Sequence, residues 1–386
     1  MTILENRLAR AALGVVTIVL PAWYFILPTF TGLGEHAGPY IQETVSLGRI
    51  QWRDSSSAAA APASIPLIKE FFGTKWLDKP FRDAAIVFSP SNLKGYDEVA
   101  WWQVWMFLMD LSGVYVVWVL EGTKRWGVTG GFLACVWLFV AQLVTIGLAG
   151  PLWYFLLFTF GRSAGGLGRK DKGNGVPKVE KKANGDGSML LPIILGLHIG
   201  MVTMAYFSPD QSARHWWIWA WQPVPLWIGI LNSGLSITVL RLPGVKRLRD
   251  HWLFSAETLS LVVGAVSVVS WVSVWLKAPY SIKEIFIPAT PLGQQTEFAL
   301  VCRELLQLDY LVSFWAAFAW LGCTFLDMYA ARTITGVEFA TAIVSIPVQC
   351  LMGGSGFALL SGWWWKERQL LKVKNNVLKE KSAKSH

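Results

Sequence analysis

The sequence predicts an all-α fold, a single bundle of about eight transmembrane helices, on three observations. Hydrophobic residues make up 53% of the 386 residues, charged residues only 15%, and the mean hydropathy is +0.42. An average soluble domain carries about 25% charged residues, so lipid must solvate much of this surface. The apolar residues also fall into long blocks that approach the thickness of a bilayer. Finally, the 23 Trp suit aromatic belts at two membrane interfaces and can also line a ligand cavity.

Eight apolar blocks are expected to form the helices of one domain that covers residues 1–386. The first block follows Arg7 and Arg10 and lacks the cleavage site of a signal peptide, so we interpret it as a membrane span. The third and the last are longer than one crossing, and a Gly-Pro pair at 150–151 and a Gly-Gly pair at 353–354 predict kinks or re-entrant turns in them. The blocks are residues 8–30, 101–120, 129–160, 189–207, 216–240, 252–276, 305–326 and 337–365.

Three polar segments lie outside the blocks. In residues 32–100, aromatic and aliphatic side chains recur at helical spacing between charges over residues 68–78, which predicts a helix lying on the membrane surface. Residues 162–188 are rich in Gly, Lys and Arg without an apolar period, which predicts a disordered basic loop. A basic tail covers residues 366–386. Eight simple crossings would put this tail on the opposite side from the basic loops at 162–188 and 241–249, which conflicts with the positive-inside rule.

The formal net charge of +9 is concentrated outside the apolar blocks. Basic segments beside membrane spans suit contact with the anionic lipid of a bilayer, and no folded basic face for nucleic acid is indicated, so we expect no nucleic-acid partner. The cysteines have no paired spacing, which argues against a disulfide frame or a zinc site; they are Cys135, Cys302, Cys323 and Cys350.

Ionisable side chains inside apolar blocks are costly, so each is a candidate functional group. Asp110 is the strongest candidate, because apolar residues flank it on both sides and no Lys or Arg is adjacent. Eleven residues later, about 16 Å along a helix, Glu121 returns to the same face. With eight simple spans, these two acids and Asp309 can line one cavity as catalytic groups. A solvated anchor is the simpler interpretation of Glu121, which lies near a span end, and an interhelical hydrogen bond is the simpler one for His198.

Aromatic and amide side chains near these acids are expected to contact substrate: Tyr115, Trp118, Trp105, Trp315 and Asn232. Aromatic faces stabilise a cation without trapping it as a nucleophile would. An acid in an apolar, aromatic chamber that excludes water suits protonation of an epoxide or olefin, followed by carbocation cyclisation of a prenyl chain. Buried carboxyl groups equally suit a proton relay, so proton-coupled transport of a lipophilic metabolite remains an alternative.

Two stretches combine aromatic and acidic residues at specific spacings. The first, over residues 81–125, contains Phe88-Ser-Pro90, Gly95-Tyr-Asp97 and Asp110-x4-Tyr115-x2-Trp118-x2-Glu121. The second, over residues 295–327, contains Cys302-Arg303, Gln307-x-Asp309-Tyr310 and Phe325-Leu-Asp327. Both resemble the integral-membrane terpene cyclases of fungal meroterpenoid biosynthesis, of the ascochlorin/ascofuranone and macrophorin type. The resemblance covers about a third of the chain.

This resemblance implies an enzyme of the endoplasmic reticulum membrane. Such an enzyme protonates a terminal epoxide or double bond of a farnesyl-type chain on an aromatic or polyketide-derived head, then guides ring closure and deprotonation. Acidic residues are the proton donors, without a metal or a departing diphosphate. Asp110 and Glu121 match acids of the first stretch, and Asp309 matches that of the second.

Several motifs of other enzyme classes are missing from the sequence. There is no Asp-Asp-x-x-Asp pair to hold magnesium on a diphosphate, and no Asp-x-Asp-Asp run of the soluble cyclases. Five His are too few for a di-iron site within the membrane, and no nucleotide-binding Gly motif follows a strand. We therefore expect no metal and no cofactor. The expected partners are a small prenylated substrate and the lipid bilayer, and the internal repeats of many transporters are not found.

Overall fold

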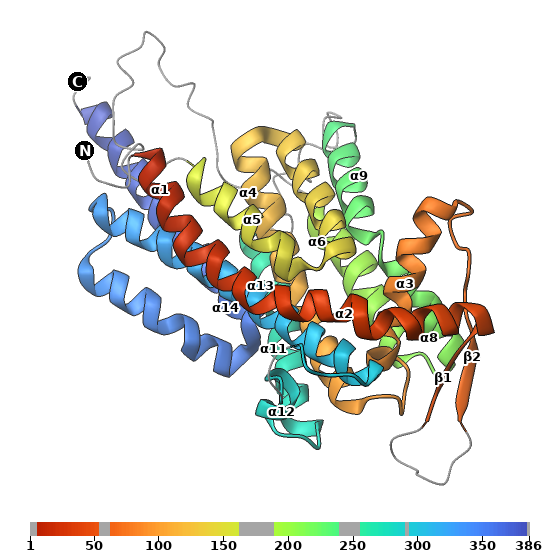
Figure 1. The fold of residues 1–386 in the computed structure, drawn as a ribbon. Coiled ribbons are helices and arrows are strands. Elements are labelled where there is room, and N and C mark those ends of the chain that lie inside the picture. The colour runs from red at the N-terminus through yellow and green to blue at the C-terminus, as the bar shows by residue number, and fades with distance from the viewer. Residues whose placement is uncertain (1–5, 54–61, 162–188, 239–254, 290–292, 384–386) are drawn as a thin grey trace.

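The structure, a computed structural model, describes residues 6–53, 62–161, 189–238, 255–289 and 293–383. Most of these residues are helical and the only described strands form one short hairpin, so the prediction of an all-α fold is confirmed (Figure 1). The predicted loop at 162–188 lies outside the described residues. The elements, with η marking π-helical turns, are α1 (Arg7–Gly14), η2 (Val15–Val19), α2 (Leu20–Leu47), β1 (Arg49–Trp52), β2 (Ala63–Pro66), α3 (Lys75–Asn92), α4 (Glu98–Val144), α5 (Ile146–Thr159), α6 (Leu190–Ile193), η4 (Ile194–Gly200), α7 (Met201–Phe207), α8 (Gln211–Trp221), α9 (Val224–Ile237), α11 (Ala256–Lys277), α12 (Ile282–Phe286), α13 (Phe298–Ala330) and α14 (Gly336–Ala383).

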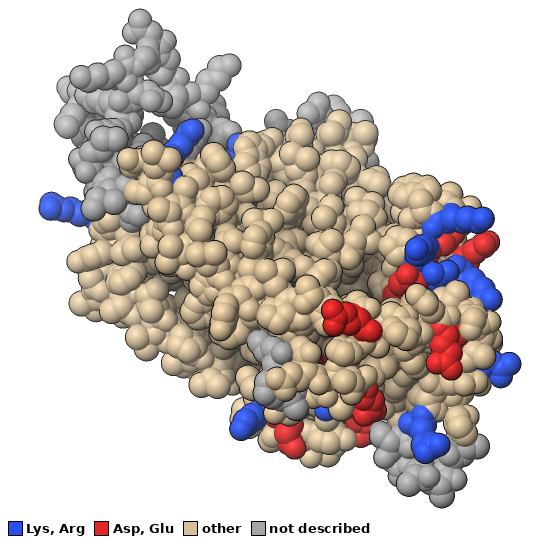
Figure 2. Space-filling model, in the orientation of Figure 1, with Lys and Arg blue, Asp and Glu red and all other residues tan. Residues whose placement is uncertain are grey.

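The helices are those of a multi-pass membrane protein. Within the described ranges, six are long and apolar enough to cross a membrane, at residues 7–47, 98–144, 190–207, 256–277, 298–330 and 336–376. Two shorter apolar helices, α5 and α9, accompany them. In Figure 2 the charged side chains gather toward the ends of the molecule and an apolar band lies between them, as expected for a protein that lipid surrounds.

The first helical unit is longer than the sequence predicts. α1, η2 and α2 continue to Leu47, well past residue 30, through two prolines inside α2. Gly48 then adopts a left-handed φ of 67°, which ends α2 and is unstrained only for glycine. β1 pairs antiparallel with β2, with Arg49 opposite Pro66. The apolar pattern does not predict this hairpin, because each of its strands has only four residues.

The predicted surface helix over residues 68–78 is wrong for most of its length, because residues 67–74 are not helical and α3 starts only at Lys75. Asp78 in its first turn accepts hydrogen bonds from the amides of Phe71, Phe72 and Thr74, at 2.8, 2.7 and 2.8 Å. Desolvation tends to raise the pKa of Asp78, but these N–H donors outweigh it and lower the pKa below its ordinary value. The loop before α3 is therefore tied to the helix that it precedes.

α4 and α5 form a re-entrant hairpin. α4 consists of two helices joined at Gly127, whose φ is 67°, and the second of them covers residues 128–144. The chain reverses at Thr145, and the Trp137 indole N–H donates to the Ala149 carbonyl across the hairpin at 3.0 Å. The two arms, about 26 and 21 Å long, are shorter than the roughly 30 Å hydrocarbon core. The predicted interruption of this block therefore exists, but it lies five residues before the Gly-Pro pair.

α14 is a second broken helix, and its break lies at the predicted glycine pair. Gly354 has a φ of 85° inside the helix. Both arms pack along the same half of α13: the ring of Phe339 stacks on Tyr329 at 5.5 Å, and Trp365 contacts Phe325 at 5.1 Å. The arms therefore form a V, and the second arm returns toward the end of the molecule from which α14 starts (Figure 1).

Candidate functional site

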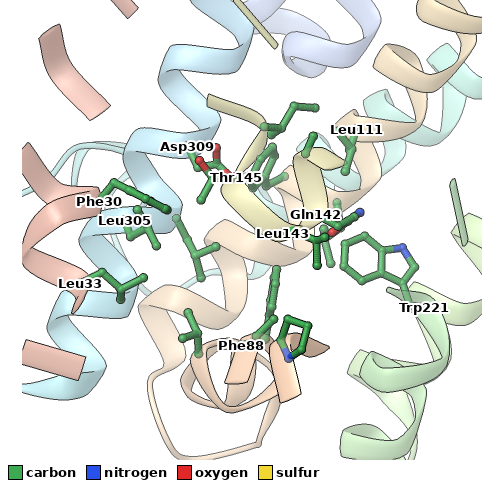
Figure 3. A pocket seen from close by; sticks show the side chains of 18 of the residues that line it. Phe30, Leu33, Phe88, Leu111, Gln142, Leu143, Thr145, Trp221, Leu305 and Asp309 are labelled. Atoms are coloured by element: carbon green, nitrogen blue, oxygen red, sulfur yellow. The ribbon is translucent and has the colours of Figure 1, made fainter. Parts of the chain in front are cut away.

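A cavity of about 310 Å³ lies between α2, α3, α4, α5, α8 and α13. The tip of the α4–α5 hairpin forms part of its wall. The first helix of α4 and α13 also line the cavity (Figure 3). Most of the lining is apolar and includes the rings of Phe30, Phe88, Phe107 and Trp221. The polar or ionisable side chains of the lining are Asp83, Tyr115, Gln142, Thr145, Asp309 and the indole of Trp221.

Asp309 brings a carboxyl group to this cavity from the middle of α13. Its Oδ1 accepts a hydrogen bond from the Gly147 amide in the first turn of α5, and the residue is only 6% exposed. A Cβ at position 147 would lie 2.8 Å from this oxygen, so only glycine permits the approach. Thr145, just before α5, has a φ of 73°, a strained conformation for a β-branched residue. The hairpin tip is therefore shaped around the Asp309 carboxyl group.

Tyr115 places a phenol on the same cavity. Its ring is fully buried, and its oxygen accepts a hydrogen bond from the Gln142 side-chain amide at 3.2 Å. Because Gln142 is the donor in this contact, the phenolic hydrogen remains free to point toward a bound ligand. The sequence-predicted substrate contact Tyr115 thus lies on the cavity, together with Gln142, which the sequence marks only as a polar companion.

Trp221 is held against the cavity by a buried histidine. The Trp221 indole N–H donates to His198 Nδ1 at 3.0 Å, so His198 carries its own hydrogen on Nε2, which lies 2.7 Å from the Leu108 carbonyl. The His198 ring also packs at 4.7 Å from Tyr115. His198 lies in the π-helical turn η4, a feature common near functional sites. The expected interhelical hydrogen bond is present, and it positions a cavity wall.

One end of the cavity is less enclosed. Asp83 of α3 has a side chain that is 31% exposed and pairs with Arg82 at 2.9 Å. Asp309 by contrast is almost completely buried. The cavity therefore has a polar, partly exposed mouth beside α3 and a buried acid within the bundle.

Asp110 does not line this cavity. It is fully buried, and its carboxyl group accepts hydrogen bonds from Ser267 Oγ at 2.5 Å, Tyr310 Oη at 3.0 Å and the Ser355 amide at 3.1 Å. Ser355 directly follows the break in α14, so Asp110 caps the N-terminus of the second arm. A Cβ at Gly356 would lie 2.7 Å from Asp110 Oδ1, and glycine is needed there too.

Glu121 is also outside the cavity. Its Oε1 lies 2.5 Å from Lys366 Nζ and accepts from the Trp363 indole at 2.8 Å, and its Oε2 lies 3.3 Å from Arg125. The solvated anchor is replaced by a buried ion pair between α4 and the second arm of α14. The three predicted catalytic acids are consequently not brought to one cavity, and Asp309 alone among them lines it.

The remaining predicted substrate contacts lie elsewhere in the bundle. Trp118 packs against Trp153 at 5.6 Å, and Trp105 contacts Phe207 at 4.8 Å. Trp315 is 54% exposed on the outside of α13, and Asn232 is a buried residue of α9. Sequence spacing alone misses Trp221, Thr145 and Asp83, because they come from three elements whose meeting depends on the fold.

The described residues contain no group of three or more His, Cys, Asp or Glu side chains arranged to hold a metal ion. The sequence profile of the CtvD domain family matches residues 49–371. The chain belongs to the CtvD domain family. This match includes every polar or ionisable side chain of the cavity lining.

Two relatives of this CtvD-family chain are Penicillium proteins named as enzymes. The FAD-dependent monooxygenase verC1 of Penicillium polonicum is 25% identical over 378 residues, which are 95% of this chain and 43% of verC1. The FAD-dependent monooxygenase anuJ of Penicillium roqueforti is 27% identical over 186 residues, which are 47% of this chain and 22% of anuJ. The chain therefore spans less than half the length of these curated relatives. No solved structure matches it.

Proposed function

We propose that this chain is a membrane-embedded terpene cyclase of fungal secondary metabolism. Its substrate is a prenylated aromatic or polyketide compound, and the reaction begins with protonation of an epoxide or olefin of the prenyl chain. One observation carries the proposal: the cavity combines a buried carboxyl group, Asp309, with the phenol of Tyr115 on otherwise apolar and aromatic walls. The expected partners, a small lipophilic molecule and the bilayer, suit a cavity of this size between membrane helices.

The proposed reaction is an isomerisation in which atoms balance without an oxidant or reductant. The Asp309 carboxylic acid protonates the epoxide oxygen, a C–O bond breaks, and the π electrons of the next double bond attack the resulting cation. After ring closure, a proton lost from a neighbouring carbon returns to the Asp309 carboxylate and leaves a new double bond. Tyr115, oriented by Gln142, donates a hydrogen bond to the oxygen that carries charge as the epoxide opens.

The aromatic walls have a role in the same sequence of steps. The Trp221 indole and the phenylalanine rings of the lining stabilise positive charge on the chain by cation–π attraction. They also exclude water, which would otherwise trap the cation as an alcohol. The partly exposed Asp83 and Arg82 at the mouth suit the polar head of such a substrate, with the prenyl chain extending to Asp309.

The names of the relatives support an epoxide as the group that is opened. Both are named FAD-dependent monooxygenases, and both are longer than the region that they share with this chain. Flavin enzymes that activate O₂ can convert an olefin into an epoxide, which is the kind of group that an acid then opens. The present chain lacks a nucleotide-binding Gly motif, so we assign it the opening step rather than the oxidation.

The test is turnover of an epoxyfarnesyl phenol by microsomes that contain the protein. We expect a cyclised product of the same mass as the substrate, formed by the wild type and by Glu43→Gln, a carboxyl-to-amide control on an exposed part of α2. Asp309→Asn should lose this activity. If no epoxidised or olefinic prenyl phenol is converted and proteoliposomes instead accumulate it against a pH gradient, proton-coupled transport replaces the cyclase. Fractionation with a marker of the endoplasmic reticulum tests the proposed location.

A further inference from the structure

The two ends of the molecule differ in charge. We call the end that holds Arg7, the junction at Gly127 and the outer part of α14 the terminal end. Contacts define it: Lys124 pairs with Glu367 at 2.6 Å, and Arg10 lies 3.5 Å from Asp327 near the end of α13. The opposite end, with β1, β2, α3, α8 and α12, is the hairpin end (Figure 1).

The terminal end presents mainly basic side chains. Glu121, Glu367 and Asp327 are paired internally with Lys366, Lys124 and Arg10. Two further acids at this end are Glu338, which caps the start of α14, and Glu257, which is exposed at the start of α11, and the exposed bases outnumber them. Exposed bases at this end are Arg7, Lys124, Arg332, Arg368, Lys372 and Lys374. In the face drawn in Figure 2, the part of the molecule near the termini shows only Lys and Arg among its charged side chains.

The hairpin end carries both signs of charge. Exposed bases and acids alternate over its loops and helices and include Lys69, Lys75, Lys79, Lys94 and Lys283 beside Glu43, Glu70, Asp210, Glu284 and Glu297. Figure 2 shows red and blue side chains mixed at this end. The excess of positive charge is thus a property of one end of the bundle.

The broken helices explain how the described basic side chains come to share that end. A straight α14 would carry the tail to the hairpin end, but the V at Gly354 returns it to the terminal end. The α4–α5 hairpin likewise returns the chain, and a Cβ at Gly161 would contact Arg125. Tyr280, three residues after the end of α11, donates to Glu98 of the hairpin end at 3.2 Å, so the last turn of α11 lies near that end and its first residue lies toward the terminal end. The conflict with the positive-inside rule depends on simple crossings, whereas here the described residues that flank the predicted basic loops, Gly161 and the first residue of α11, lie toward the terminal end together with the second arm of α14.

We propose that the terminal end faces the cytosol and lies against the anionic headgroups of the cytosolic leaflet, with the hairpin end on the opposite side of the membrane. Lys and Arg near membrane spans are retained on the cytosolic side, and the anionic lipid of that leaflet attracts them. The inference is independent of the cyclase chemistry. It places the cavity mouth beside Asp83 in the half of the membrane away from the cytosol.

Glycosylation and protease accessibility test this orientation in the full-length protein. The sequence has no Asn-x-Ser/Thr acceptor, so engineered acceptors report without background. Ser55→Asn creates Asn-Ser-Ser at residues 55–57 between the strands, and Asp186→Thr creates Asn-Gly-Thr at residues 184–186 between α5 and α6. We expect Ser55→Asn to be glycosylated in microsomes and Asp186→Thr to remain unmodified. Adding Ser57→Ala to Ser55→Asn removes the acceptor and should abolish the shift.

A C-terminal epitope tag gives a second readout that does not depend on enzyme access to a glycosylation site. In sealed microsomes, protease added outside should remove the tag from the wild-type chain. A protected tag, or glycosylation of Asp186→Thr, would overturn the proposal, as would modification at both engineered sites. If Ser55→Asn stays unmodified, digestion of the tag still supports the orientation and protection of the tag refutes it.

Discussion

The substitutions Asp309→Asn and Asp110→Asn distinguish a catalytic acid in the cavity from an acid that only stabilises α14. The sequence favours Asp110 as the proton donor, whereas the cavity contains Asp309. Asp309→Asn keeps the shape of the side chain, and its amide oxygen can still accept the Gly147 N–H. We therefore expect a stability close to that of the wild type and a turnover lower by about 10²- to 10⁴-fold, the usual contribution of a general acid.

Asp110→Asn should instead lower the stability of the protein and leave most of its turnover intact. The Asn amide group has one acceptor oxygen where the carboxylate has two, against three donors in the structure. Ser267 Oγ can donate instead to the Gly353 carbonyl at 3.0 Å, and Tyr310 Oη can donate to Ser355 Oγ at 2.9 Å. The remaining Asn oxygen can still accept the Ser355 amide, but the negative charge at the N-terminus of the second arm of α14 is lost, at a cost of about 1–2 kcal/mol.

The assay measures thermal unfolding in detergent, with size-exclusion chromatography reporting the folded fraction after heating. Turnover is then normalised to that folded fraction. Asp110→Asn should lower the Tm by several degrees while the folded protein keeps activity within about tenfold of the wild type. The reasoning fails if Asp110→Asn removes turnover at an unchanged Tm while Asp309→Asn remains active. That result would make the capping carboxylate the catalytic acid.

Three further substitutions test the cavity walls, the ion pair and the mouth. His198→Ala frees the Trp221 indole, and we expect turnover about tenfold lower with more water-quenched product, since about 1.4 kcal/mol of cation–π stabilisation is lost; an unchanged product profile would contradict this. Glu121→Gln leaves the buried Lys366 with Glu367, at 3.0 Å, as its remaining anionic partner. The substitution should therefore cost about 3 kcal/mol, the lower end of the range for breaking a buried pair, and much of this should be recovered when Lys366→Met is added; a single variant as stable as the wild type would refute the ion pair. Asp83→Asn should raise KM severalfold at an unchanged kcat, and a loss confined to kcat would exclude a role in binding the substrate head.

The positions of the two helix breaks show how far sequence patterns reach. The Gly-Gly pair correctly marks the break at Gly354, because glycine adopts the required φ of 85° without strain. The Gly-Pro pair marks the wrong residue of the other hairpin. Its break lies at Thr145, which has a positive φ despite its branched side chain, because Asp309 from a distant helix accepts the Gly147 amide. No local pattern contains that contact.

The candidate site was accessible to sequence reasoning only in part. Asp309 and Tyr115 stand out because acids and phenols within apolar blocks are rare, and both line the cavity. Asp110 and Glu121 stand out for the same reason, yet one caps a helix arm and the other forms a buried ion pair. Rarity identifies a side chain that needs a partner, but it does not tell whether the partner is a substrate or the protein itself.

The sequence by itself determined the all-α membrane architecture, because hydropathy and block length depend on composition along the chain and on the thickness of a bilayer. It also determined which ionisable groups are available at membrane depth. Only the tertiary structure decided which of them faces a cavity and at which end the described basic side chains gather. Both outcomes follow from the two re-entrant arms, whose reversals at Thr145 and Gly354 are stabilised by contacts between residues more than 100 positions apart.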